Sequence, residues 1–167
     1  MRALAAELGV SAMTPYRWLS GKEELFALVR TDAFTRFGDR LEAALDAGGA
    51  AMTRLRRLAR AYVQFALDDP DAYRIMFELS QVEAPGDAAA ALAAASKRAF
   101  AFLHDTVAAC CEAGDLDGDP LTLAHLLWAD THGLVSLHLA GQLRMGRTLE
   151  QLLATEHHLE GVKRRKT

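Results

Sequence analysis

The feature that most constrains this chain is the spacing of its apolar residues, which recur at intervals of three and four along almost its whole length. The longest such stretch begins at Lys22 and runs to a break at Gly48 and Gly49. Its apolar positions are Leu25, Leu28, Val29, Phe34, Phe37, Leu41, Ala44 and Leu45. This spacing places them on one face of an α-helix. We find no segment with the strict apolar–polar alternation of a strand, so the sequence predicts an all-α protein.

Glycine and proline mark where the predicted helices end. Gly9 follows the first apolar segment, in the position where a helix commonly stops at a left-handed residue. Pro70 ends a later helix because it lacks a backbone N–H and restricts the residue before it. The predicted helices span residues 2–8, 11–19, 22–47, 51–67, 71–80, 87–113, 121–142 and 147–160.

The composition is that of an ordinary globular chain: 167 residues, of which 51% are apolar and 25% charged. This apolar content excludes a disordered chain, and no apolar run approaches the roughly 20 residues of a membrane-spanning helix. The first segment carries Glu7 within its apolar stretch and does not read as a secretory signal. Cys110 and Cys111 are adjacent, so they cannot readily bridge each other. We therefore expect a cytoplasmic protein without a disulfide framework and without a membrane partner.

The net charge of −3 is unevenly distributed. Residues 1–40 carry six Lys and Arg against five Asp and Glu, a balance of +1. Residues 41–67 and 121–167 each carry +2, whereas residues 68–120 carry −8. A DNA-binding end can coexist with an acidic middle, because only the contacting face must attract phosphate.

The N-terminal segment has the arrangement of a helix-turn-helix. Two short predicted helices are joined by Gly9, Val10 and Ser11. Glycine suits the tight turn, and Ser11 stands where the second helix needs an N-cap. The exposed residues of that second helix would be presented to the major groove of double-stranded DNA.

The segment LAAELGVSAMTPYRWLSGKEEL resembles the DNA-binding segment of the TetR family of bacterial transcriptional repressors. The matching residues are Gly9, Val10, Ser11, Thr14, Tyr16, Lys22, Glu23 and Leu25. By this resemblance, the Thr14 and Tyr16 hydroxyls bond DNA phosphates, and Lys22 contacts the DNA backbone from the start of the long helix. The candidate DNA-contacting residues are Ser11, Met13, Thr14, Pro15, Tyr16, Arg17 and Lys22, with Met13, Pro15 and Arg17 nearest to base edges.

Two departures from the family pattern bear on DNA binding. Pro15 falls in the first turns of the recognition helix, where it forfeits a backbone hydrogen bond and favours a short, 3₁₀-like start. The family's DNA-binding domain has three helices, and the first would precede Met1, so the chain is expected to lack it. The resemblance implies a helix-turn-helix domain over residues 1–38 and a larger ligand-binding and dimerisation domain over residues 39–167.

In the second half of the chain, Trp128, His132 and Gly133 are similar to a Trp-x-x-x-His-Gly signature of one C-terminal subclass of the family. Trp128 and His132 are four residues apart, so they share a helix face. They form either a core aromatic with a hydrogen-bonded histidine beside it, or the wall of a small-molecule pocket in which one polar group lies among apolar ones. The other candidate pocket residues are Tyr62, Phe65, Met76, Phe77, Phe100, Phe102 and Leu103.

The segment 121–142 is apolar around its whole circumference. Such a helix must be covered on all sides, and the core of a chain this small covers only one. We expect a second subunit to cover the other, with the helices at 121–142 and 147–160 forming a four-helix interface. The candidate contacts are Leu127, Leu134, Val135, Leu149, Leu152 and Leu153.

These features and the resemblance predict a ligand-responsive repressor that binds a pseudo-palindromic operator as a homodimer and is released by a small-molecule inducer. One alternative is a helical dimerisation or ligand-binding module that has lost DNA binding. An enzyme that uses His132 with Asp130 or Asp105 is disfavoured, because Asp130 and His132 diverge on one helix. We expect no cofactor and no metal site, since the sequence contains no CxxC, HxxxH or HExxH motif.

Overall fold

The structure, a computed structural model, describes residues 2–7, 9–11, 13–77 and 86–154. Within these ranges the chain is all-α, as predicted, and no strand occurs. The elements are α1 (Arg2–Glu7), a 3₁₀ turn η1 (Pro15–Arg17), α2 (Lys22–Leu45), α3 (Ala51–Asp68), α4 (Pro70–Phe77), α5 (Gly86–Glu112), α6 (Pro120–Leu139) and α7 (Leu149–Ala154). No helix in the described part of the chain is long and apolar enough to cross a membrane.

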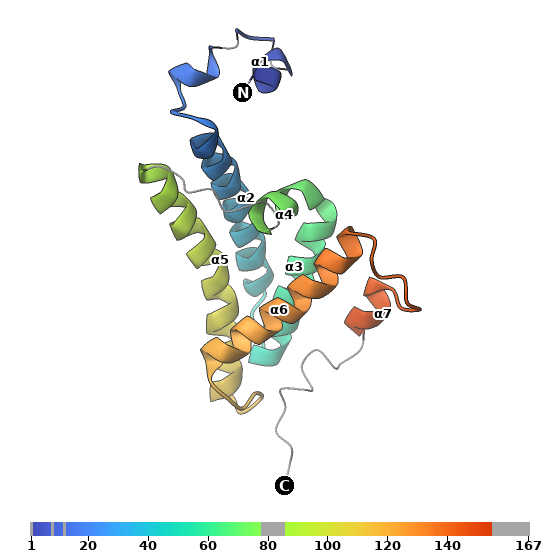
Figure 1. Cartoon of the computed structure of the whole chain (residues 1–167). Helices are drawn as coiled ribbons and strands as arrows, with labels where there is room; N and C mark the ends of the chain where they lie inside the picture. Colours follow the sequence, from blue (N-terminus) through green and yellow to red (C-terminus); the bar gives the residue numbers. More distant parts are fainter. Residues whose placement is uncertain (1, 8, 12, 78–85, 155–167) are drawn as a thin grey trace.

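The long helix α2 organises the bundle, because α3, α4 and α5 all pack against it (Figure 1). Its buried face shares only Phe34, Phe37 and Leu41 with the stripe predicted from the sequence, and the predicted Leu28 and Val29 are exposed at 44% and 40%. The other buried residues of this face are Ala27, Arg30, Ala33 and Gly38. Helix α6 crosses α3 and α5, and α7 packs against α6. Figure 1 shows α1 and the 3₁₀ turn beyond the outer end of α2, away from the rest of the bundle.

A glycine on α2 leaves room for an arginine side chain from α5. A Cβ at Gly38 would lie 3.0 Å from Nη1 of Arg98 on α5, so a larger residue would displace that side chain. From its observed position Arg98 donates to Asp39 at 2.8 Å and to Glu42 at 2.7 Å. Arg98 thus ties α5 to two successive turns of α2.

Aromatic side chains fill the centre of the bundle. The ring of Phe37 lies 5.3 Å from that of Tyr62 and 5.1 Å from that of Phe65. Each fully buried side chain of this size contributes about 1.5–3 kcal/mol to folding through the surface it removes from water. These contacts hold α2 against α3 and fix the positions of the helices that surround the cavity described below.

Local sequence signals explain several helix boundaries. Gly9 adopts a positive φ of 65°, and Val10 N donates to Ala5 O at 2.9 Å, so α1 ends as predicted. Asp69 is the N-cap of α4: its carboxylate accepts from Ala72 N at 3.0 Å. The same carboxylate pairs with Arg36 of α2 at 2.7 Å.

Two predicted helices differ from the structure. The predicted helix at 11–19 is reduced to the 3₁₀ turn, because Pro15 has no N–H and the bonds that form are i→i−3, from Thr14 N to Ser11 O and from Arg17 N to Thr14 O. Helix α6 ends at Leu139 rather than at residue 142, because Gly141 adopts a left-handed conformation there. The ends of the predicted helices at 71–80 and 147–160 lie partly outside the described residues.

Candidate functional site

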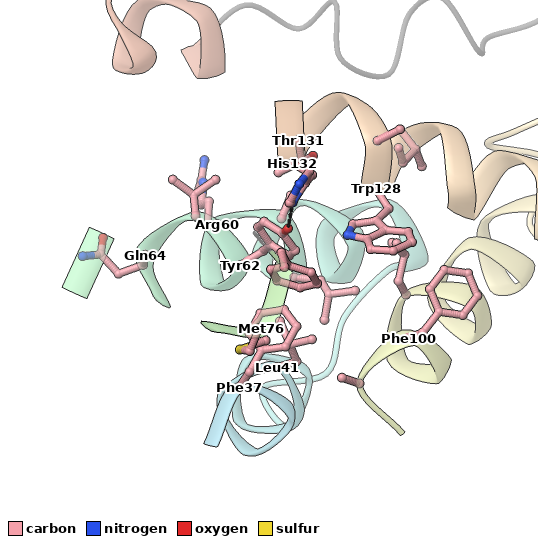
Figure 2. A pocket seen from close by; sticks show the side chains of 18 of the residues that line it. Phe37, Leu41, Arg60, Tyr62, Gln64, Met76, Phe100, Trp128, Thr131 and His132 are labelled. Carbon is pink, nitrogen blue, oxygen red and sulfur yellow. Dashed lines mark hydrogen bonds between the residues drawn. The ribbon is translucent and has the colours of Figure 1, made fainter. Parts of the chain in front are cut away.

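A cavity of about 1310 Å³ lies inside the helical bundle, between α2, α3, α4, α5 and α6. Its lining is mainly aromatic and aliphatic, and Figure 2 shows the side chains of Phe37, Leu41, Tyr62, Met76, Phe100 and Trp128 around it. Glu150 and Leu153 of α7 also border it. Its largely apolar lining with a few polar groups is that of a small-molecule binding site, and its volume exceeds the roughly 300–1,000 Å³ usual for such a site.

A cluster of hydrogen-bonding groups lies at one wall of this cavity. Nδ1 of His132 is 2.6 Å from the Tyr73 hydroxyl and 3.1 Å from the Tyr62 hydroxyl, and the two hydroxyls are 3.3 Å apart. Oγ of Ser136 lies 3.4 Å from Nε2 of the same imidazole. The geometry fits a neutral His132 that carries its proton on Nε2 and accepts at Nδ1.

Burial keeps the Tyr62 hydroxyl of this cluster neutral. It raises the pKa of Tyr62 far above the ordinary value for a phenol, and the neighbouring Tyr73 hydroxyl adds to the rise. Tyr62 therefore keeps its proton at physiological pH and serves as a hydrogen-bond donor and acceptor without charge. Tyr62 and His132 both line the cavity, so the cluster offers a ligand polar contacts within a largely apolar wall.

The ring of Phe77 lies among the other aromatic side chains of the site. It is 5.6 Å from the ring of Phe34, 6.1 Å from that of Trp128 and 5.1 Å from that of His132. Because these rings come from α2, α4 and α6, a ligand that displaced one of them would act on several helices at once.

Most of the predicted pocket residues do line the cavity, and two do not. Those that line it are Tyr62, Met76, Phe77, Phe100, Leu103, Trp128 and His132. Phe65 is instead a core residue packed on Phe37, and the ring of Phe102 lies beneath the guanidinium of Arg98 at 5.4 Å. Trp128 and His132 border the cavity and also contact core residues, so this geometry fits either of the two interpretations.

The floor of the cavity on α2 was not predicted from the sequence. Phe34, Phe37 and Arg30 line it from there, and Arg30 is only 5% exposed. The signal was present in the sequence, because Arg30 is three residues after Ala27 and four before Phe34 and so falls on the apolar stripe of the helix.

The segment predicted to read DNA is exposed. The side chains of Met13, Tyr16 and Trp18 are 67%, 48% and 79% exposed, and Arg17 is exposed as well. Thr14 is half-buried, and Ser11 Oγ accepts from Met13 N at 3.4 Å.

Lys22 begins α2, as predicted, and its ammonium lies 5.2 Å from the centre of the Phe26 ring. The turn before it is held by Glu24, whose carboxylate accepts from the backbone N–H and the hydroxyl of Ser20 at 2.6 and 2.7 Å. These bonds lower the pKa of Glu24. The carboxylate thus stabilises the turn that connects the exposed segment to α2.

The structure places three of the predicted interface residues inside the chain's own core. Leu127, Val135 and Leu149 are buried there, so they have no surface left to offer a second subunit. Leu134, Leu152 and Leu153 are half-buried. An all-apolar helix carries no sequence signal of which face turns inward, so the burial of Leu127 and Val135 could not be predicted.

The outer face of α6 instead presents an apolar strip that we call the α6 strip: Leu126, Gly133, Leu137 and Ala140. Leu126 and Leu137 are 56% and 46% exposed. A Cβ at Gly133 would meet nothing within 4 Å, so no group of the described residues approaches that point. Asp130 lies at the edge of the strip.

A family model described as the tetracyclin repressor-like C-terminal domain matches residues 55–158. The chain belongs to the TetR family. The cavity lies largely within the matched region, which contributes α3, α4, α5, α6 and α7 to its walls. No group of three or more His, Cys, Asp or Glu side chains in the described part of this TetR-family chain could hold a metal ion.

Known relatives agree with this assignment. The chain is 26% identical to the HTH-type transcriptional regulator Rv1816 of Mycobacterium tuberculosis, over 85% of this chain and 72% of the relative. It matches a structure of a protein of unknown function from Rhodococcus sp. RHA1 with a TM-score of 0.79, 26% identity and coverage of 98% of this chain and 84% of that one. The crystal structure of SCO4313 matches with a TM-score of 0.75, 29% identity and coverage of 95% and 82%.

Proposed function

We propose that this TetR-family chain is a ligand-responsive transcriptional repressor. In this proposal, residues 1–38 read a pseudo-palindromic operator, residues 39–167 bind a small molecule and dimerise, and binding of that molecule releases the DNA. The observation that carries the proposal is the cavity of about 1310 Å³, whose floor is formed by the same helix that begins at Lys22 beside the exposed segment. One helix thus joins the two expected sites.

The arrangement of α2 supports coupling between them. Phe34 and Phe37 of α2 line the cavity, and about 12 to 15 residues separate them from Lys22, which corresponds to roughly 18–22 Å of helix. A ligand that shifts α2 against α4 or α6 would move Lys22 and the segment before it. In a dimer, such shifts change the spacing between two reading segments and so lower the affinity for an operator of fixed spacing.

The α6 strip supports the homodimer. It is apolar, runs along one face of α6 and contains a glycine that would let another helix approach closely. Two-fold dimers use the same patch on both subunits, so one self-complementary strip is sufficient.

The DNA-binding part is tested by selecting duplexes from a random library with the purified full chain and measuring their affinity over a range of salt concentrations. Lys22→Ala and Tyr16→Phe should weaken binding to selected and random DNA alike. Of these two, only Lys22→Ala removes a cation from the DNA, so only this substitution should reduce the salt slope, by about 0.9. Arg17→Ala should instead relax sequence preference. Arg147→Ala, an exposed arginine beyond α6, is the matched control and should change neither quantity.

Two results would contradict this assignment. If no sequence is enriched in the selection, the chain does not act by reading an operator. If all three substitutions change specific and random binding equally, the division into phosphate-contacting and base-reading residues is wrong.

A further inference from the structure

Arg30 is a buried cation on the floor of the cavity. It belongs to the buried stripe of α2, it is only 5% exposed, and it lines the cavity together with Phe34 and Met76. Charged side chains are rarely buried in this way unless an opposite charge accompanies them, because removing a charge from water is costly.

No carboxylate of the described residues accompanies this guanidinium. Its Nη2 donates to the backbone carbonyl of Met76 at 2.9 Å, and its Nε has no hydrogen-bond partner within the described residues. Burial lowers the pKa of Arg30, and no negative charge on the described residues offsets that effect. The side chain nonetheless stays protonated, since the ordinary pKa of a guanidinium is above 12.

The bond to Met76 accounts for only part of this arrangement. Met76 lies in the last turn of α4, where a cation is favourable because helix carbonyls point outward there. That role uses one N–H of a group that has five, arranged as a fork that fits the two oxygens of a carboxylate. It leaves the buried Nε without an acceptor among the described residues, on a side chain that borders a largely apolar cavity.

The other charged groups on the lining favour a negative ligand. Arg56 and Arg60 are exposed where they border the cavity, and Glu150 is the acidic residue that borders it. With Arg30, the described lining has three cationic side chains and one anionic one. Most of the remaining surface is aromatic or aliphatic, so it suits the apolar body of a ligand and not a highly charged one.

We propose that the small molecule bound in this cavity is an organic acid, with an apolar body among the aromatic rings and a carboxylate paired with Arg30. This inference rests on the proposed ligand response and specifies the chemical class of the ligand. The carboxylate would supply the acceptor that Nε lacks and the charge that the buried guanidinium lacks. The neutral Tyr62 and His132 would contact any further polar group of the ligand.

The test uses the purified full chain and two matched pairs of probes: decanoate with decan-1-ol, and 1-naphthoate with 1-naphthylmethanol. Calorimetric titration at pH 7.5 compares the affinity of each acid with that of the alcohol of nearly the same shape. We expect at least one acid to bind about tenfold or more tightly than its alcohol, because a hydrogen-bonded charge pair is stronger than a neutral contact.

Variants of Arg30 then assign the preference to this side chain. Arg30→Met should weaken acid binding about tenfold or more and leave alcohol binding unchanged, whereas Arg30→Lys should retain part of the preference. Arg147→Met, an exposed arginine outside the cavity lining, is the control and should bind like the wild type. Circular dichroism establishes that each variant is folded. If Arg30→Met unfolds, the ratio of acid to alcohol affinity in the wild type, compared with that in Arg30→Lys, shows whether Arg30 causes the acid preference.

The possible results separate this inference from the proposed function. Alcohols that bind as tightly as the acids, or an acid preference that persists in Arg30→Met, would overturn the assignment of an acidic ligand and leave a ligand-responsive regulator intact. If none of the four probes binds, the cavity does not act as a small-molecule site, and both the ligand response and the acidic ligand are wrong.

Discussion

Substitution of the α6 strip provides the sharpest test of how this chain assembles. Leu126→Glu and Leu137→Glu each place a carboxylate on the face expected to meet a second subunit. Full burial of a leucine side chain contributes about 1.5–3 kcal/mol, and these two side chains are 56% and 46% exposed in the single chain. About half of that contribution, roughly 0.8–1.5 kcal/mol, therefore remains to be gained by each side chain at an interface.

Two-fold symmetry doubles the interface free energy lost by each substitution. In a two-fold dimer each substitution occurs on both subunits, so losing one leucine costs about 1.5–3 kcal/mol per dimer. An unpaired carboxylate against an apolar partner adds to this cost. The dissociation constant should thus rise by at least about 10- to 150-fold, since each 1.4 kcal/mol is a factor of ten.

Sedimentation velocity over a series of micromolar concentrations measures this change. The matched control is Leu121→Glu, because Leu121 is 49% exposed on the same helix but five residues from Leu126, about 140° around the axis. The reasoning is refuted if Leu121→Glu dissociates the protein as strongly as the other two, or if both strip variants keep the wild-type dissociation constant. A wild-type chain that is monomeric at these concentrations refutes the interface altogether.

Two further predictions concern titratable groups. The ion pair with Arg36 and the bond from Ala72 N lower the pKa of Asp69, so its charge stabilises the fold above the ordinary pKa near 3.8 and stops doing so as the pH falls through the lowered value. Asp69→Asn should cost about 0.5–1 kcal/mol of stability at pH 7 in urea unfolding, and this cost should shrink as the pH falls below 3.8. A cost that does not change with pH would contradict this. Burial raises the pKa of Cys110 to about 11, whereas Cys111 is partly exposed. Iodoacetamide at pH 8 should therefore modify Cys111 first and Cys110 only after unfolding, as followed by mass spectrometry, and equal rates would show that the Cys110 thiol is not buried.

Local signals in the sequence predicted most helix boundaries correctly because their causes are local. Gly9 and Pro70 act through their own backbone conformations, and the structure has helix ends at both. The effect of Pro15 was larger than predicted, since without its N–H the segment forms only a 3₁₀ turn. Gly141 carried the same kind of signal as Gly9, but the apolar pattern around it favoured a longer helix.

What the sequence could not supply was the orientation of one helix against another. Apolar spacing shows that a residue faces inward, but it does not distinguish packed core from cavity wall, so Phe65 and Tyr62 could not be told apart. Val135 was placed at the interface for a related reason: α6 is apolar on every side, and only its packing on α3 and α5 shows which side is inside. Arg30 differs from these residues, because a charged residue within an apolar stripe can be recognised from the sequence alone.

The continuity of α2 has a consequence for how chains with this architecture can change. The 24-residue helix carries Lys22 at one end and the cavity floor further along, with no loop between them. Inserting one residue into that stretch would turn everything before it by about 100° and advance it by about 1.5 Å. Inserting a whole turn would nearly restore the rotation of that segment about the helix axis, but it would still lengthen the distance from Lys22 to the cavity floor. The stretch from Lys22 to Phe34 therefore has a fixed length and a fixed angular phase, and the connections outside α2 are where this chain can gain or lose residues at little cost.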